Sequence, residues 1–206
     1  MALGDRYEGI LAAAGEVIAR RGFHQASIRD IARAARLSLA GLYHYVGGKD
    51  ELLFLVLDQA LNRLIATLDQ ALAEARTPET RLLALIRTHL EFGLHHPQQL
   101  KVINRDWEVL PEAQRAEIGA KRQAYLGRGL AVLRELDPRQ RQADELFSAT
   151  NLLLGMLNGI ATRPFLRSPD DTRALAAQVG ALFLYGFLEH AGAVPAEGST
   201  TARRSA

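Results

Sequence analysis

The amino-acid sequence predicts an all-α fold of about nine helices, and three observations lead to that prediction. Alanine and leucine dominate the chain, β-branched residues are few, and strand-like alternation of apolar and polar residues is nearly absent. The 206 residues are 48% hydrophobic and 23% charged, the balance of a globular protein that buries a sizeable core. Cysteine is absent, which excludes disulfides, thiolate metal sites and cysteine nucleophiles.

Periodic apolar residues and helix-ending residues divide the chain into successive elements. Each segment repeats apolar side chains three or four positions apart, as one face of a helix requires. The expected helices are 6–21, 28–35, 39–45, 49–75, 78–95, 98–106, 111–135, 138–162 and 170–191.

The ends of the first three helices follow from capping residues. Gly22 ends the first helix because glycine readily adopts a left-handed conformation. Ser27 is a suitable N-cap for the second, and Asp30 three residues later completes an acidic variant of the capping box. Ser38 caps the third helix, and the pair Gly47-Gly48 ends it.

Proline and histidine mark the boundaries of the longer helices that follow. Pro78 suits the first turn of the helix over 78–95, and His95-His96-Pro97 ends that helix. Pro111 opens the helix after the short one, and Asp137-Pro138 reads as a cap followed by the start of the next. Ser168-Pro169 begins the last helix.

The charge distribution is uneven along the chain. The net charge is +2, and the whole excess falls within residues 1–50, which permits a polyanionic partner. No apolar stretch is long enough to span a membrane, and the N-terminus lacks the pattern of a signal peptide. We expect a soluble, cytoplasmic protein with a head over 1–48, a body over 49–193 and a flexible tail over 194–206.

Residues 27–49 contain the pattern of a helix-turn-helix motif, two short helices joined by a tight turn. The second helix of such a motif lies in the major groove of DNA and reads base edges. Leu42 and Val46 are expected to face the core, while Ala40 and Gly41 allow close approach to DNA. The residues expected to point outward with hydrogen-bonding groups are Tyr43, His44 and Tyr45.

Several segments here resemble the DNA-binding head of TetR-family transcriptional regulators. They are Ser27-Ile28-Arg29-Asp30-Ile31-Ala32, Leu37-Ser38, Leu42-Tyr43-His44-Tyr45-Val46 and Lys49-Asp50-Glu51-Leu52-Leu53. The resemblance implies a homodimer that binds double-stranded operator DNA and whose C-terminal body binds a small effector.

The resemblance also implies roles for individual residues. Ser27 and Lys49 match phosphate contacts, Tyr43 an aromatic contact to backbone or bases, and His44 and Tyr45 further backbone contacts. Alternatively, the tyrosines are ordinary packing residues, and Arg29 belongs to a solvated surface. The expected DNA-contacting residues are Ser27, Arg29, Ser38, Leu39, Ala40, Gly41, Tyr43, His44, Tyr45 and Lys49.

Three positions depart from the family pattern. Arg36 stands where the turn usually has glycine, and a positive φ there would cost about 1 kcal/mol. Leu39 replaces a commonly polar residue of the reading helix. Gly47-Gly48 replaces a side-chain cap before Lys49.

The body offers no sign of catalysis, metal binding or a bound cofactor. It contains no glycine-rich phosphate loop, no zinc-protease motif and no credible catalytic triad. His89, His95 and His96 do not form a metal-binding pattern, because the last two are adjacent and face different sides of a helix. We therefore expect no enzyme activity, no catalytic residue and no metal site.

Two stretches of the body resemble the TetR-family subset that responds to acyl-CoA thioesters. They run from Leu94 to Tyr125 and from Leu154 to Ile160, although Arg163 stands where that subset usually has an aromatic residue. An apolar cavity with a few polar groups is how small-ligand sites are built. The candidate ligand-binding residues are Phe92, Arg105, Trp107, Arg122, Tyr125, Asn151, Leu154 and Asn158. The asparagines could equally be satisfied core amides and the tryptophan a packing residue.

Small residues recur in the last two helices and suggest a close helical interface. They alternate with large apolar side chains, which favours a two-fold dimer in which each subunit contributes two helices. The small residues are Ala149, Gly155, Gly159, Ala177, Ala181 and Gly186, and the large ones are Leu152, Leu153, Leu182, Phe183 and Phe187.

Two functions follow as hypotheses. The first is a dimeric, ligand-responsive regulator, most simply a repressor that an effector releases from a palindromic operator. The second is an all-helical acyl-CoA carrier or enzyme whose head is only a packing module.

Overall fold

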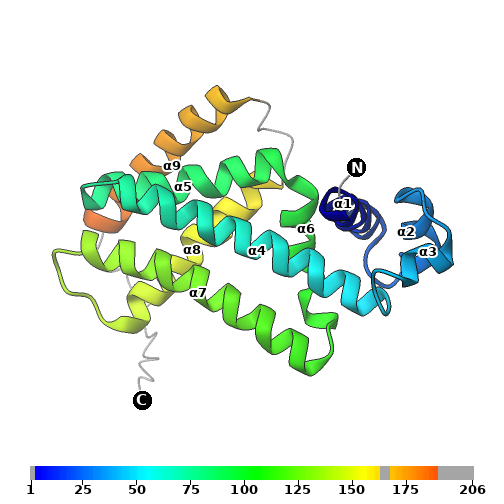
Figure 1. The fold of residues 1–206 in the computed structure, drawn as a ribbon. Coiled ribbons are helices and arrows are strands. Elements are labelled where there is room, and N and C mark those ends of the chain that lie inside the picture. The colour runs from blue at the N-terminus through cyan, green and yellow to red at the C-terminus, as the bar shows by residue number, and fades with distance from the viewer. Residues whose placement is uncertain (1–2, 163–167, 190–206) are drawn as a thin grey trace, which may run out of the picture.

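The computed structural model describes residues 3–162 and 168–189, and all regular structure in these ranges is helical (Figure 1). The all-α prediction is therefore confirmed for the described residues. The α-helices are α1 (Leu3–Arg21), α2 (Ile28–Ala34), α3 (Leu39–Tyr43), α4 (Lys49–Glu74), α5 (Pro78–His95), α6 (Pro97–Arg105), α7 (Glu112–Leu136), α8 (Ala143–Ala161) and α9 (Pro169–Glu189), with one 3-10 helix, η1 (Trp107–Val109), before α7.

The helices form a small head at one end of an elongated helical body (Figure 1). In the head, α1 packs against α2 and against α4, and α2 packs against α3. In the body, α5 is the central helix, because it contacts α4, α6, α7, α8 and α9. The short helix α6 lies between the two regions and packs against α1 as well as α4.

The hydrophobic core continues from the head into the body without a break. Ile10 and Ile18 of α1, Leu53 of α4 and Leu85 of α5 belong to one cluster of buried side chains. Because α4 contributes buried residues along its whole length, its first turns complete the core of the head while its later turns belong to the body. The expected boundary between a DNA-binding head and a ligand-binding body at residue 48 therefore remains a prediction.

The start of α8 differs from the sequence-based expectation. We expected a helix from residue 138, but α8 begins at Ala143. Asp137 does accept backbone hydrogen bonds, from Arg139 N at 3.2 Å and Arg141 N at 2.5 Å, but these close a turn. Gln140 in that turn has a φ of 51°, which is incompatible with a continuous helix.

Smaller differences concern the reading helix and the segment before α7. The helix expected over 39–45 ends at Tyr43, and η1 was not expected. Arg163 and the tail over 194–206 lie outside the described residues, as does the side chain of Phe187. Among the described helices, none combines the length and apolar character that crossing a membrane would require.

Candidate DNA-binding surface and ligand cavity

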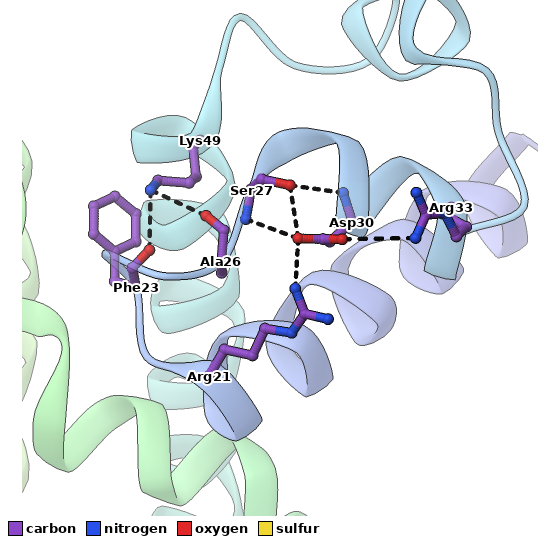
Figure 2. Close-up of polar contacts among 7 residues, drawn as sticks. All are labelled: Arg21, Phe23, Ala26, Ser27, Asp30, Arg33 and Lys49. Carbon is purple, nitrogen blue, oxygen red and sulfur yellow. Dashed lines mark hydrogen bonds and ion pairs between the residues drawn. The ribbon is translucent and has the colours of Figure 1, made fainter.

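The N-terminus of α2 is fixed by a reciprocal cap (Figure 2). Asp30 N donates to Ser27 Oγ at 3.1 Å, and Ser27 N donates to the Asp30 carboxylate at 3.4 Å. The Ser27 hydroxyl also donates to Asp30 Oδ2 at 2.7 Å, and this bond holds the pKa of the Asp30 carboxyl below its ordinary value. Arg21 joins the same carboxylate at 2.7 Å. A phosphate at Ser27 would therefore compete with Asp30 for the hydroxyl proton.

The turn between α2 and α3 is a Schellman motif with arginine in place of glycine. Leu37 N donates to Ala32 O at 2.9 Å and Arg36 N to Arg33 O at 3.1 Å, which is the double hydrogen bond of that motif. Arg36 has a φ of 56°. The departure from the family pattern at this position thus keeps the geometry that glycine usually provides, at a conformational cost of about 1 kcal/mol.

The short helix α3 is positioned by its cap and by two buried side chains. Gly41 N donates to Ser38 Oγ at 2.9 Å. Leu42 and Val46 are buried, as the sequence pattern predicted. A Cβ on Gly41 would lie 3.1 Å from Ser38 Oγ, a tight contact that would displace the capping hydroxyl slightly.

The outer side of the motif presents most of the expected DNA contacts to solvent. Tyr43 is 49% exposed, so its large side chain is not packed into the core. The other exposed candidates are Ser27, Arg29, Ser38, Ala40 and His44. Leu39 and Gly41 are half-buried. Tyr45 is also half-buried and packs against the core, so it points outward less than the sequence pattern suggested.

Lys49 is held by the loop before α2 (Figure 2). Its Nζ donates to Phe23 O at 2.9 Å and to Ala26 O at 3.1 Å, and it lies 4.2 Å from the centre of the Phe23 ring. An ammonium group has three donors, so one remains for a phosphate. The expected phosphate contact stays a prediction, and the structure adds a second role in which Lys49 fastens α4 to the head.

A cavity of about 310 Å³ opens in the body between α4, α5, α6, α7 and α8. Seven of its fourteen lining residues have polar side chains. The lining residues are Leu61, Leu64, His89, Leu100, Ile103, Asn104, Arg122, Gln123, Tyr125, Leu126, Asn151, Leu154, Gly155 and Asn158.

Five of the eight candidate ligand-binding residues line this cavity, namely Arg122, Tyr125, Asn151, Leu154 and Asn158. The structure does not bring the other three to its wall. Phe92 is buried with its ring 5.0 Å from that of His96, and Trp107 lies beneath Arg122, whose guanidinium is 4.7 Å from the ring centre.

Arg105 points toward α1. Its guanidinium donates to Ile18 O at 2.7 Å and to Ala19 O at 3.4 Å, and it pairs with Asp106 at 2.8 Å. The carboxylate of Asp106 in turn accepts a hydrogen bond from Phe23 N at 3.2 Å. The last residue of α6 and the residue that follows it therefore tie the body to the end of α1. The expected role of Arg105 in ligand binding has no support in its position.

Sequence reasoning missed most of the apolar lining and three polar residues of the cavity, His89, Asn104 and Gln123. His89 Nδ1 lies 2.9 Å from the Tyr125 hydroxyl, and Asn104 Nδ2 donates to Asn158 Oδ1 at 2.9 Å. Both partners come from helices far along the chain. The available signal was the helical repeat, which places His89 on the same face of α5 as the buried Leu82, Leu85 and Ile86.

Burial controls the protonation of the polar groups at the closed end of the cavity. It lowers the pKa of His89 to about 4, an effect that the nearby Asn158 amide only partly opposes, so the imidazole is neutral near pH 7. Burial also raises the pKa of the Tyr125 hydroxyl, which keeps that group protonated. Arg122 is partly desolvated, which lowers its pKa while Glu108 opposes the shift.

The outer faces of α8 and α9 expose large apolar side chains. They are Phe147, Leu152, Met156, Leu182 and Tyr185. A Cβ added to Gly155, Gly159 or Gly186 would meet no atom within 4 Å, so these small residues border open space. Of the expected interface residues, Leu153 is instead buried in the core of its own chain and Phe183 packs partly against it.

An all-helical chain with a capped helix-turn-helix at one end belongs, by its architecture, to the helix-turn-helix proteins. Family sequence models narrow that class: "Bacterial regulatory proteins, tetR family" matches residues 10–56, and "Tetracyclin repressor-like, C-terminal domain" matches residues 75–162. The chain belongs to the TetR family of bacterial regulatory proteins.

Individual relatives agree with this assignment. The HTH-type transcriptional regulator BetI of Rhizobium meliloti (strain 1021) is 30% identical over 172 residues, 79% of either chain. The fatty acid metabolism regulator protein of Bacillus subtilis (strain 168) is 29% identical over 84 residues, 41% of this chain and 43% of that protein. A crystal structure of a TetR-family transcriptional regulator from Bordetella parapertussis 12822 is 29% identical, with a TM-score of 0.81 over 91% of this chain and 98% of that one.

The matches to other curated relatives are shorter. This chain matches 50% of the length of the HTH-type transcriptional activator FasR of Mycolicibacterium smegmatis and 41% of the length of the HTH-type transcriptional regulator BetI of Brucella canis.

Proposed function

We propose that this protein is a ligand-responsive, DNA-binding transcriptional regulator, a cytoplasmic repressor that a small effector releases from a palindromic operator. The observation that carries the proposal is the pairing of a capped helix-turn-helix with a separate, partly polar cavity in one continuous core. A regulator needs both a surface for DNA and a second site whose occupancy biases that surface.

The exposed apolar face of α8 and α9 supports a homodimer. Large apolar side chains in contact with water are unfavourable, and a second copy would cover them. The exposed side chains Leu152 and Leu182 alternate with glycines that border open space, which allows helices to approach closely. A two-fold dimer also matches a palindromic operator, because each half-site then meets an equivalent head.

The helix α6 is the element through which we propose that the effector acts on the head. Arg122, in the cavity wall, donates to Ile103 O of α6 at 2.8 Å. Arg105 at the end of α6 donates to the carbonyls that end α1, and Asp106 accepts a hydrogen bond from Phe23. A ligand that displaces Arg122 would therefore shift a helix hydrogen-bonded directly to the head. The differential contacts of the two states would set the size of the response.

We further propose an acyl-CoA thioester as effector. The resemblance of residues 94–125 and 154–160 to acyl-CoA-responsive regulators supports this class. Arg122 supplies a cation in the cavity wall that an anionic ligand could meet. Arg105 is already engaged with α1, which leaves Arg122 as the cation for the anionic part of the ligand.

Binding assays with a selected operator test the proposal. DNA sites would be enriched from a random-sequence pool, and the affinity of one site measured by fluorescence anisotropy across a range of salt concentrations. We expect a steep salt dependence, a loss of affinity in Tyr43→Ala, and release on addition of an acyl-CoA far more than of free CoA. Absence of any sequence-selective binding would overturn the proposal, and turnover of a thioester would favour the carrier or enzyme.

A further inference from the structure

The closed end of the cavity contains a buried polar atom that the protein itself leaves unsatisfied. His89 is only 3% exposed and Tyr125 only 6%. The Nδ1 atom of His89 is engaged by the Tyr125 hydroxyl, whereas Nε2 has no hydrogen-bond partner among the described residues, although the Asn158 amide lies nearby. A buried polar atom without a partner is costly, and such atoms commonly mark a site that something else completes.

The histidine and tyrosine offer the cavity one hydrogen-bond donor in either arrangement of their protons. If the Tyr125 hydroxyl donates to Nδ1, then Nε2 carries the imidazole proton and can donate to a ligand. If Nδ1 donates to the hydroxyl oxygen, then the Tyr125 proton is free to donate and Nε2 accepts. A ligand oxygen of a hydroxyl or carbonyl group therefore fits this end of the cavity. A methyl or methylene group would instead leave the His89 or Tyr125 donor without a hydrogen-bond partner.

The rest of the wall favours a negatively charged ligand of limited size. Arg122 is the charged side chain of the wall, and no carboxylate lines the cavity within the described residues. Asn104, Gln123 and Asn151 are exposed, so the mouth lies on their side and the buried His89 at the other end. The volume of about 310 Å³ is at the lower end of the range for small-molecule sites. A long, unbranched alkyl chain matches neither the polarity nor the volume.

We propose that the effector inserts a short, oxygen-bearing acyl group, whose hydroxyl or keto oxygen hydrogen-bonds to His89 Nε2 or its Tyr125 partner while an anionic group meets Arg122. This inference rests on the proposed ligand-responsive function and specifies the effector of that same cavity. The anionic group has two chemical sources. A free hydroxy or keto acid supplies a carboxylate, and the corresponding CoA thioester supplies phosphates.

Calorimetric titration of the purified full-length chain with matched probe pairs tests the inference. The pairs are butyryl-CoA with 3-hydroxybutyryl-CoA and butyrate with 3-hydroxybutyrate, and hexadecanoyl-CoA tests the limit on length. We expect the hydroxylated member of at least one pair to bind about tenfold more tightly, as one added hydrogen bond to a buried group implies. The pair that shows the preference identifies the source of the anion. Hexadecanoyl-CoA should bind more weakly than either short thioester.

Variants separate recognition from folding. His89→Phe should abolish the preference for the hydroxylated probe, whereas His95→Phe, on the same helix but outside the cavity, should preserve it. Tyr125→Phe keeps the ring in place and should reduce the preference, so the test does not depend on one variant. Arg122→Met should weaken both members of a pair alike, and Arg128→Met, on the same helix and paired with Asp69, should not.

The inference is overturned if no probe binds, if plain and hydroxylated probes bind equally in both pairs, or if the preference survives in His89→Phe. Each of these results leaves the DNA-binding assays unaffected, because those measure sequence-selective binding in the absence of effector. Loss of DNA binding would instead overturn the proposed function.

Discussion

Acidification should destabilise the wild-type protein more than the variant His89→Phe, by about 2 kcal/mol between pH 7 and pH 5. Burial lowers the pKa of His89 from 6.5 to about 4. Below pH 6.5 the unfolded chain therefore binds a proton at His89 that the folded chain accepts only near pH 4. Stability that is fully present above the unfolded pKa is lost as the pH falls toward the folded value. Each unit between the unfolded pKa and the pH corresponds to about 1.4 kcal/mol. The fall from pH 6.5 to pH 5 covers about 1.5 such units, which gives about 2 kcal/mol.

Urea unfolding followed by circular dichroism at both pH values measures this difference. His96 also has a pKa lowered by burial, and its contribution is the same in wild type and variant, so the comparison isolates His89. The variant His24→Phe, at an exposed histidine of the head, is the matched control and should lose as much stability as the wild type. Equal losses in wild type and His89→Phe would refute the reasoning, because they would show that the imidazole is not buried in its neutral form.

Four further predictions address the head and the packing of the body. Tyr43→Ala should weaken operator binding at least tenfold at unchanged melting temperature, since the side chain is 49% exposed, and wild-type affinity would contradict its role. Lys49→Ala should lower the slope of affinity against salt by about one per half-site and also lower the melting temperature, because two backbone carbonyls lose their donor. Arg36→Gly should relieve the positive φ and raise the melting temperature by about 2 °C, corresponding to about 0.5–1 kcal/mol. Gly93→Ala should destabilise the protein by about 2 kcal/mol in urea unfolding, because its Cβ would lie 2.5 Å from a methyl group of α8, whereas Gly127→Ala, which meets open space, should be slightly stabilising.

The helix boundaries of the head could be predicted because their determinants are local. Ser27 and Ser38 cap the helices that follow them, and Gly22 has a φ of 83° at the end of α1. The same local reasoning failed at Asp137, where the expected cap instead closes a turn. Nothing in the pair Asp137-Pro138 distinguishes these outcomes. The competing interactions with residues 139 and 141 decide between them.

The candidate site residues show the same difference between features that are local in the sequence and features that depend on tertiary packing. The expected DNA-contacting residues lie within 23 consecutive positions, so one motif could indicate them together. The cavity collects residues from five helices, and helical periodicity could suggest only groups that share a helix, such as Arg122 with Tyr125. The pairing of His89 with Tyr125 crosses 36 residues of sequence and depends on how α5 and α7 pack.

The contrast between two arginines shows why tertiary placement decides function here. Arg105 and Arg122 were equivalent candidates as cations in the sequence, and each donates to a backbone carbonyl of another element. Arg122 spans from α7 to α6 at the cavity wall, whereas Arg105 spans from α6 to the last turn of α1. Arg122 and Arg105 therefore form two successive links, the first from the cavity wall to α6 and the second from α6 to the head. In the mechanism that we propose, a ligand contact at Arg122 and the anchoring contact of Arg105 together transmit effector binding from the body to the DNA-binding surface.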